Sequence, residues 1–156
     1  MVASSDTRVT LESCSLFRGL PPEVVDRIQK LAFERRFAVD QTIFAEGQPA
    51  VELCILASGS VELDYTLPNN PQVLVAITRV SPGDVFAWSA LAGGGCLTAR
   101  ARTLDDSCVY AIPADDLRSL LDAHVDAGYV VMTRLTELVA SRLRDTRDQL
   151  RWLQSQ

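Results

Sequence analysis

The part of the sequence that says most about the fold is residues 53–63, which read LCILASGSVEL. Two apolar runs, residues 53–56 and 61–63, lie on either side of Ser58-Gly59. Short apolar runs are typical of strands, whereas a serine–glycine pair is typical of a turn. The stretch therefore predicts two short strands joined by a tight turn.

Similar runs continue on both sides of this stretch. Further β-rich segments lie at residues 42–44, 73–77 and 108–112, and turn signals such as Glu46-Gly47 and Pro82-Gly83-Asp84 separate them. Many short strands with no long helix between them are typical of a rolled or closed antiparallel structure. We therefore expect a β-roll over residues 33–112.

Helical patterns flank the expected roll. Pro21-Pro22-Glu23 marks a helix start, and apolar residues recur at helical spacing from Val24 to Leu31. We expect helices at residues 22–32, 113–121 and 126–153. The predicted fold class is α+β, mainly β: an antiparallel, jelly-roll-like β-roll with an N-terminal helix and a long C-terminal helix. Residues 1–14 would form an N-terminal extension, and residues 15–156 one domain.

The last predicted helix is about 40 Å long at 1.5 Å per residue, more than a domain of this size needs to cover itself. It carries an apolar stripe with one threonine: Met132, Leu135, Val139, Leu143, Thr146, Leu150 and Leu153. A parallel helix from a second copy would bury the far end of this stripe, which predicts a homodimer. The alternative is a helix that folds back on its own roll.

The charge and hydropathy of the sequence are not typical of a protein that binds nucleic acid or a membrane. The net charge is −5, and the densest basic stretch, Arg142 to Arg151, is interleaved with Asp145 and Asp148. This pattern is typical of a solvated helix with internal ion pairs rather than of a DNA-contacting arm. No apolar run approaches the roughly 20 residues of a membrane span, and the N-terminus resembles no export signal. We expect a cytoplasmic protein that binds neither nucleic acid nor membrane.

The sequence offers no pattern for a metal centre or a catalytic site. Its four cysteines, Cys14, Cys54, Cys96 and Cys108, form no C-x-x-C pair, and the single histidine, His124, is near none of them. We therefore expect no metal and no cofactor, reduced and mostly buried thiols, and a histidine at a helix–helix junction. Neither a Ser-His-Asp set nor a pair of catalytic acids is visible, so we expect no enzyme.

Several motifs in this order resemble one family. They are Leu16-Phe17-x-x-Leu20, the glycine turns at 43–47 and 55–61, Gly83-Asp84-Val85-Phe86, and Ser141-Arg142-Leu143. Over residues 15 to 152 the chain resembles the cyclic-nucleotide-binding domain family, the sensory half of the catabolite activator and fumarate–nitrate regulator group. A helix-turn-helix domain follows the long helix in transcription factors of that group. None lies before Gln156, so the resemblance predicts a stand-alone domain without a DNA-reading part.

The resemblance also implies a ligand site. In the family a short helix after G-D-x-F attracts the cyclic phosphate, a glycine–glutamate pair meets the ribose, and an Arg-Ser/Thr-Ala triplet holds the phosphate oxygens. A hydroxyl on the long helix meets the purine base. Carried onto this sequence, the ligand-binding residues are Phe86, Ala87, Trp88, Ser89, Leu97, Thr98, Ala99 and Thr146.

This sequence departs from the family pattern at three positions. Ala87 stands for the glycine, Trp88 for the glutamate and Leu97 for the arginine, although Thr98 and Ala99 match. Strand alternation sends Arg100 and Arg102 outward, so neither replaces the missing arginine. Cyclic AMP binding is therefore expected to be weak or absent.

Two interpretations of the function stay open. One is a regulatory domain in which a cyclic nucleotide or another small molecule shifts the long helix and, through it, an unidentified protein partner. The other is a degenerate domain that serves as a dimerisation or protein-docking module. Trp88 and Leu97 fit either, because they would line an apolar pocket or fill it.

Overall fold

The structure is a computed structural model, and it describes residues 8–93 and 95–156. Its helices are η1 (Leu11–Ser13), α1 (Pro22–Leu31), α2 (Ser89–Ala92), α3 (Ala114–Ala123) and α4 (Val125–Gln154). Its strands are β1 (Phe33–Phe37), β2 (Thr42–Phe44), β3 (Glu52–Ser58), β4 (Val61–Leu67), β5 (Asn70–Val80), β6 (Val85–Phe86), β7 (Arg100–Thr103) and β8 (Ser107–Pro113). The three helices predicted from the sequence are present within one or two residues of their expected ends.

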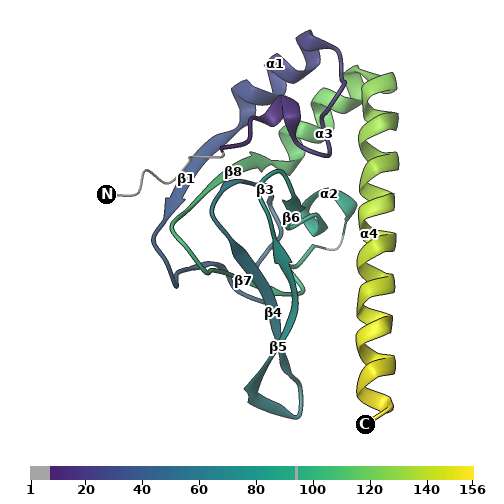
Figure 1. Ribbon diagram of the computed structural model, residues 1–156. Helices are drawn as coiled ribbons and strands as arrows, with labels where there is room; N and C mark the ends of the chain where they lie inside the picture. The colour runs from purple at the N-terminus through teal and green to yellow at the C-terminus, as the bar shows by residue number, and fades with distance from the viewer. Residues whose placement is uncertain (1–7, 94) are drawn as a thin grey trace.

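The strands within the described residues form two four-stranded antiparallel sheets, in the orders β1-β8-β3-β6 and β2-β7-β4-β5. The sheets face each other as a roll, with α1 and α3 at one end and the β4–β5 hairpin projecting from the other (Figure 1). α4 runs beside the whole roll (Figure 1). The predicted fold class, a mainly β antiparallel roll with an N-terminal and a long C-terminal helix, is confirmed.

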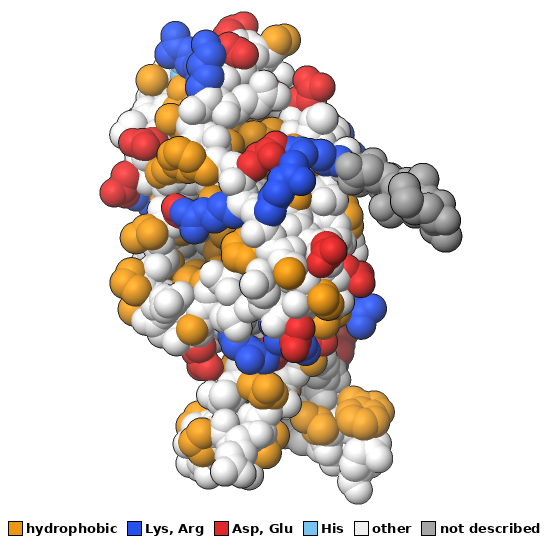
Figure 2. Space-filling view, turned by 90° about the vertical axis from the view of Figure 1, so that its left-hand side faces the viewer, with side chains coloured by type: hydrophobic (Ala, Val, Ile, Leu, Met, Phe, Trp, Pro, Cys, Tyr) orange, Lys and Arg blue, Asp and Glu red, His pale blue; other side chains and the backbone are white. Residues whose placement is uncertain are grey.

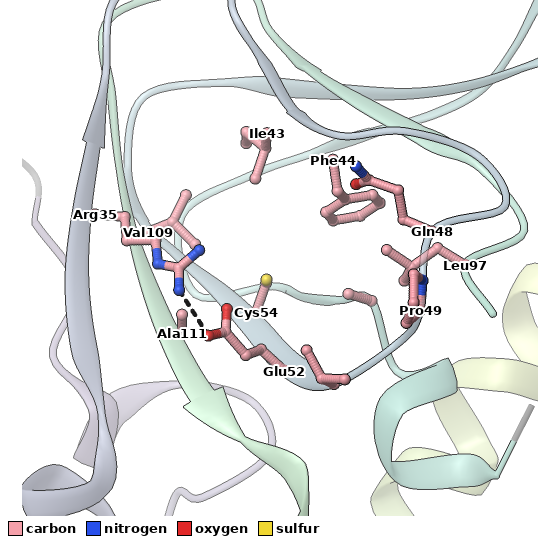
Figure 3. A pocket seen from close by; sticks show the side chains of 12 residues that line it. Arg35, Ile43, Phe44, Gln48, Pro49, Glu52, Cys54, Leu97, Val109 and Ala111 are labelled. Carbon is pink, nitrogen blue, oxygen red and sulfur yellow. Dashed lines mark hydrogen bonds and ion pairs between the residues drawn. The ribbon is translucent and has the colours of Figure 1, made fainter. Parts of the chain in front are cut away.

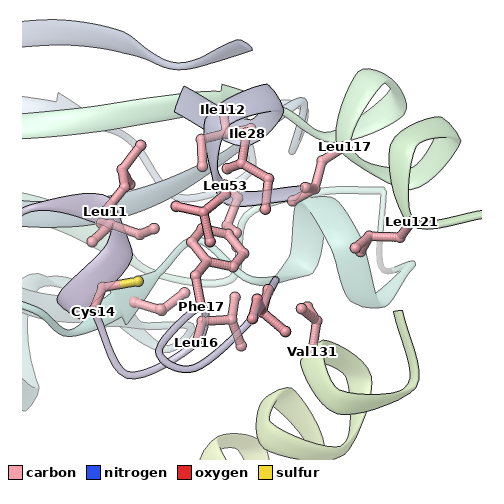
Figure 4. Packing of buried hydrophobic residues seen from close by; sticks show 14 of the residues in the cluster. Leu11, Cys14, Leu16, Phe17, Ile28, Leu53, Ile112, Leu117, Leu121 and Val131 are labelled. Carbon is pink, nitrogen blue, oxygen red and sulfur yellow. The ribbon is translucent and has the colours of Figure 1, made fainter. Parts of the chain in front are cut away.

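Strand β3 joins two hydrophobic cores because both of its faces are buried. Leu53 and Ile55 point into a core between the roll and the helices, which also holds Phe17 from the N-terminal segment (Figure 4). Cys54 and Leu56 point into the interior of the roll. Burial on both faces explains why this strand is an unbroken apolar run rather than an alternating one.

The turn between β3 and β4 depends on Gly59. Its φ is +96°, a backbone conformation that side chains disfavour, and a Cβ here would lie 2.6 Å from the carbonyl oxygen of Asp106. The amide of Ser60 donates a hydrogen bond to the Ser107 hydroxyl at 3.2 Å. The turn therefore packs directly on the β7–β8 connection, which leaves room for glycine alone.

The segment before α1 is part of the packed domain. Leu11 and Cys14, which the sequence placed in an N-terminal extension, are buried in the helical core. Arg134 of α4 donates hydrogen bonds to the carbonyls of Leu16 at 3.2 Å and Arg18 at 2.5 Å. These contacts tie the N-terminal segment to α4. Residues 1–7 of the expected extension lie outside the described residues.

Helix α4 has an inward and an outward face. Val131 and Leu135 face the domain and are buried, so Leu135, which the sequence analysis counted in the apolar stripe, packs on the domain itself. Nine positions follow strict four–three spacing, and all of them are exposed except the half-buried Thr146: Val125, Tyr129, Met132, Thr136, Val139, Leu143, Thr146, Leu150 and Leu153. Such spacing is the heptad pattern of a coiled coil.

The apolar side chains on the outward face are solvent-exposed, from 38% at Val139 to 75% at Tyr129. Hydrophobic side chains gather at the lower end of the molecule, on the hairpin tip and the end of α4 (Figure 2). Trp152 and Leu153 near the end of α4 are 63% and 57% exposed, and Leu74 on the hairpin is 51% exposed. We call the outward heptad face of α4 the seam.

Candidate functional site

The site begins at the turn between β6 and α2. Phe86 ends β6, and Ala87 follows with a φ of +57°, in the left-handed region that favours glycine. Trp88 then precedes α2, where the amide of Leu91 donates to the Trp88 carbonyl at 2.9 Å. The backbone here adopts a glycine conformation without a glycine, which strains the turn.

Seven of the eight expected site residues surround one cavity of about 210 Å³. They are Ala87, Trp88, Ser89, Leu97, Thr98, Ala99 and Thr146. The remaining lining residues are Phe44, Leu63, Ile77 and Arg142. The cavity therefore lies between the roll, the cassette around α2, and α4.

Phe86 is the expected site residue that does not line this cavity. It is fully buried in the core of the roll and stacks on Phe44, with ring centroids 6.0 Å apart. Its side chain packs in the same cluster as Leu63 and Ile77, which line the cavity. Phe86 thus supports the cavity wall through Phe44 rather than facing a ligand.

Arg142 is the lining residue that sequence reasoning placed elsewhere, on a solvated helix with internal ion pairs. Its guanidinium lies 5.2 Å from the centre of the Trp88 ring, in a cation–π arrangement. Its Nη1 atom is buried and has no hydrogen-bond partner. Burial lowers the pKa of Arg142, and the carboxylates of Asp145 and Asp84 offset this only in part.

One sequence signal could have placed Arg142 at the cavity. It precedes Thr146 by four residues, so the two side chains lie on the same face of α4. The Thr146 hydroxyl donates to the Arg142 carbonyl at 3.0 Å, so its proton is already engaged. Assigning Thr146 to the site therefore implied that Arg142 is close to it.

A second, smaller cavity of about 150 Å³ lies inside the roll and shares the wall formed by Phe44, Ala87 and Leu97 (Figure 3). The Cys54 thiol faces it, and burial raises the pKa of that thiol to about 12. An ion pair between Arg35 and Glu52, 2.6 Å apart, lies on its other side (Figure 3). The part next to the shared wall is therefore uncharged.

The arginines of β7 do not contribute charge to the larger cavity. Ala101 is buried inward, as the alternation predicts, while Arg100 donates two hydrogen bonds to Asp64 at 2.8 and 2.7 Å. Arg102 lies 2.8 Å from an Asp40 carboxylate oxygen. Both guanidinium groups are held by acids and line neither cavity.

Other features bear on the remaining expectations. The described cysteines are free thiols, three buried and Cys96 exposed, and His124 lies at the junction of α3 and α4, which confirms both expectations. Within residues 8–93 and 95–156, no group of three or more His, Cys, Asp or Glu side chains is placed to hold a metal ion. None of the helices in the described chain combines the length and apolarity of a membrane span.

Comparison with known protein families gives an assignment. The sequence model of the cyclic nucleotide-binding domain matches residues 34–124, which is more than half of the 156-residue chain. The chain belongs to this family. The matched region runs from β1 to the junction of α3 and α4, and so includes the family's roll and the turn that carries Trp88.

Two curated relatives come from bacteria. The CRP-like cAMP-activated global transcriptional regulator of Mycobacterium tuberculosis is 27% identical over 140 residues, which cover 90% of this chain and 60% of the regulator. The cyclic AMP receptor protein of Thermus thermophilus is 28% identical over 135 residues, covering 86% of this chain and 60% of the receptor. This chain thus spans 60% of the length of the curated relatives it matches. Their names describe regulatory proteins rather than enzymes.

Solved structures show the same roll. The Thermus thermophilus catabolite activator protein matches with a TM-score of 0.73 and 28% identity, over 90% of this chain and 63% of that protein. The N-terminal domain of a Streptomyces coelicolor transcriptional regulator matches with a TM-score of 0.69 and 26% identity, over 90% of this chain and 94% of that one. The cyclic nucleotide-binding family assignment thus rests on sequence and structure together.

Proposed function

We propose that this chain is a non-enzymatic regulatory domain that senses a small molecule in the 210 Å³ cavity and relays its presence through α4. One observation carries the proposal: the cavity is walled on one side by the cassette residues Trp88 and Ser89, and on the other by Arg142 and Thr146 of α4. A ligand there contacts both elements at once. Its binding therefore shifts any equilibrium in which α4 changes position relative to the roll.

Cyclic AMP is a poor fit for this cavity. The family arginine and glutamate are replaced by Leu97 and Trp88, and no carboxylate lies among the lining residues to accept a ribose hydroxyl. We do not expect Arg142 to restore the phosphate contact, because its guanidinium lies beside Trp88, at the position of the family glutamate, and not at Leu97, the position of the family arginine. We therefore expect weak or absent cyclic AMP binding, unlike the binding named for the mycobacterial relative.

Calorimetric titration of the unmodified protein with cyclic mono- and dinucleotides tests this reading of the cassette. We expect no heat of binding for cyclic AMP at micromolar concentrations. Binding at low micromolar Kd would show that another group holds the phosphate. The inference that Trp88 and Leu97 remove the ribose and phosphate contacts would then be wrong.

The seam of α4 supports a homodimer as the output of the domain. Leu143 and Leu150 are 68% and 53% exposed, and they repeat at seven residues along a face that the roll does not cover. A parallel copy of the same helix would bury them by knobs-into-holes packing. Replacing both leucines by glutamate should convert a dimer into a monomer in sedimentation equilibrium. Arg144→Glu, on the exposed face away from the seam, is the matched control and should leave the dimer intact.

The alternative function, a dimerisation or docking module that binds no ligand, is favoured by one observation. The exposed Trp152 and Leu153 lie at the end of α4, at 63% and 57% exposure, far from the cavity. If no small molecule binds and the seam still associates, this alternative accounts for the protein better than ligand sensing does.

A further inference from the structure

The 210 Å³ cavity has an uneven distribution of polar groups. Most of its wall is apolar, with Phe44, Leu63, Ile77 and Leu97 among the lining residues. The only charged group among the described lining residues is the guanidinium of Arg142. The remaining polar side-chain groups among them are the indole N–H of Trp88 and the hydroxyls of Ser89, Thr98 and Thr146.

Among the described residues, the guanidinium of Arg142 has no acid within ion-pair distance. Its Nη1 atom is buried and has no hydrogen-bond acceptor in the part of the chain that the structure describes. The guanidinium lies over the face of the Trp88 ring, and this contact gives its N–H groups no hydrogen-bond acceptor. A buried cationic donor without an acceptor is unfavourable, and an anionic acceptor from a ligand would satisfy it.

We propose that the ligand of this cavity is a small organic monoanion, a carboxylate on an apolar body, whose charge is bound by Arg142 of α4. The inference rests on the proposed function of this cavity as a ligand site. A carboxylate matches the planar fork of an arginine and forms two parallel hydrogen bonds with it. One guanidinium balances one negative charge, whereas a phosphate monoester carries about −1.5 to −2 at neutral pH.

The apolar walls determine the rest of the ligand. Leu63, Ile77 and Leu97 contact its body and offer no hydrogen bonds, so a sugar or a second charged group would lose its water without replacement. The volume of about 210 Å³ is below the roughly 300–1,000 Å³ of pockets for drug-sized ligands, so the body is short. The ligand is oriented with its charge on α4 and its apolar part toward the roll.

Tryptophan fluorescence provides a direct measurement. The chain has two tryptophans, and the exposed Trp152 can be replaced by phenylalanine so that Trp88, under the Arg142 guanidinium, gives the whole signal. The full-length Trp152→Phe protein is titrated with octanoate and cinnamate, and separately with 1-octanol and cinnamyl alcohol as neutral counterparts, at constant ionic strength. We expect a saturable change in Trp88 emission with each carboxylate, at a Kd at least tenfold below that of its alcohol.

Two variants test whether Arg142 is the source of the preference for carboxylates over alcohols. Arg142→Gln should bind carboxylate and alcohol equally, with carboxylate affinity reduced at least tenfold and alcohol affinity unchanged. Arg144→Gln removes the same charge from an exposed position two residues further on, about 200° around α4 from Arg142, and should behave as the parent. Circular dichroism melting of all three proteins shows whether each remains folded.

The outcomes separate this inference from the proposed function. Equal affinity of the parent for carboxylates and alcohols would overturn the monoanion proposal while leaving a ligand cavity in place. A charge preference that survives Arg142→Gln would also overturn it. Absence of any saturable response to either carboxylate would refute it, whereas the sensing function would still be decided by the nucleotide titrations.

Discussion

Restoring the family residues in the cassette should strengthen cyclic AMP binding, which we expect to be weak or absent in the native chain. The variant combines Trp88→Glu, Leu97→Arg and Ala87→Gly. Losing an arginine–phosphate contact costs about 1.5–3 kcal/mol, and losing the ribose acceptor about 1–3 kcal/mol. Together the two losses are on the order of 3–5 kcal/mol, or roughly a thousandfold in affinity. The native cavity keeps Thr98 and Ala99 of the phosphate-binding triplet and lacks its arginine.

The structure indicates how each substitution would fit. Glutamate at position 88 would replace a ring that lies 5.2 Å from the Arg142 guanidinium, so the new carboxylate gains a cationic neighbour. Arginine at position 97 replaces a side chain that is 8% exposed and lies between the two cavities, which provide space for it. Glycine at position 87 adopts the observed φ of +57° without strain.

Isothermal titration calorimetry with cyclic AMP measures the gain. We expect the triple variant to bind at least a hundredfold more tightly than the native protein. Trp88→Gln with Leu97→Met and Ala87→Gly is the matched control, because it changes the same positions without adding charge. A variant that melts as cooperatively as the native protein and still shows no binding would refute our account of the cassette. The docking-module alternative would then be the better explanation.

Three further predictions concern backbone strain and thiol exposure. Gly59→Ala should lower the free energy of unfolding by about 3–5 kcal/mol in urea titrations, because left-handed strain and a backbone clash each cost about 1–3 kcal/mol. Gly19 has a φ of +79° and no atom within 4 Å of the position that a Cβ would take. Gly19→Ala should therefore lower the free energy of unfolding by the cost of the left-handed strain alone. Ala87→Gly should gain about 0.5–1 kcal/mol, since relieving roughly 1–2 kcal/mol of strain outweighs the added chain entropy. Alkylation of the folded protein at pH 8 should modify Cys96 alone by mass spectrometry, because the other three thiols are buried and that of Cys54 has a pKa of about 12.

Much of the fold could be predicted because its signals are local. The glycine turn at Ser58-Gly59 and the apolar runs beside it specify two strands without knowledge of their partners. The helix ends followed from Pro22 and from the spacing of apolar residues. Leu135 was misplaced because a stripe at three- and four-residue steps does not show which of its members face the domain and which face solvent. That distinction depends on where α4 packs.

The site could be predicted only as far as the family motifs extend. The cassette residues from Ala87 to Ala99 surround one cavity because they are close together in the chain and follow one turn. Arg142 lies more than forty residues further on, among arginines and aspartates that are exposed to solvent, and composition alone does not separate it from them. Its role depends on Trp88, because a glutamate at that position would pair with the guanidinium and leave no unsatisfied donor.

The position of Thr146 connects the ligand cavity to the seam. It lies on the cavity wall and also occupies a heptad position between Leu143 and Leu150. A ligand that contacts Arg142 and Thr146 therefore acts within one helical turn of the leucines that would pack against a second copy. Coupling between two sites is reciprocal. If the ligand changes dimer affinity by a given factor, dimerisation changes ligand affinity by the same factor. The same helix can thus report occupancy without a large movement, because the residues that bind the ligand and those that form the seam are neighbours on α4.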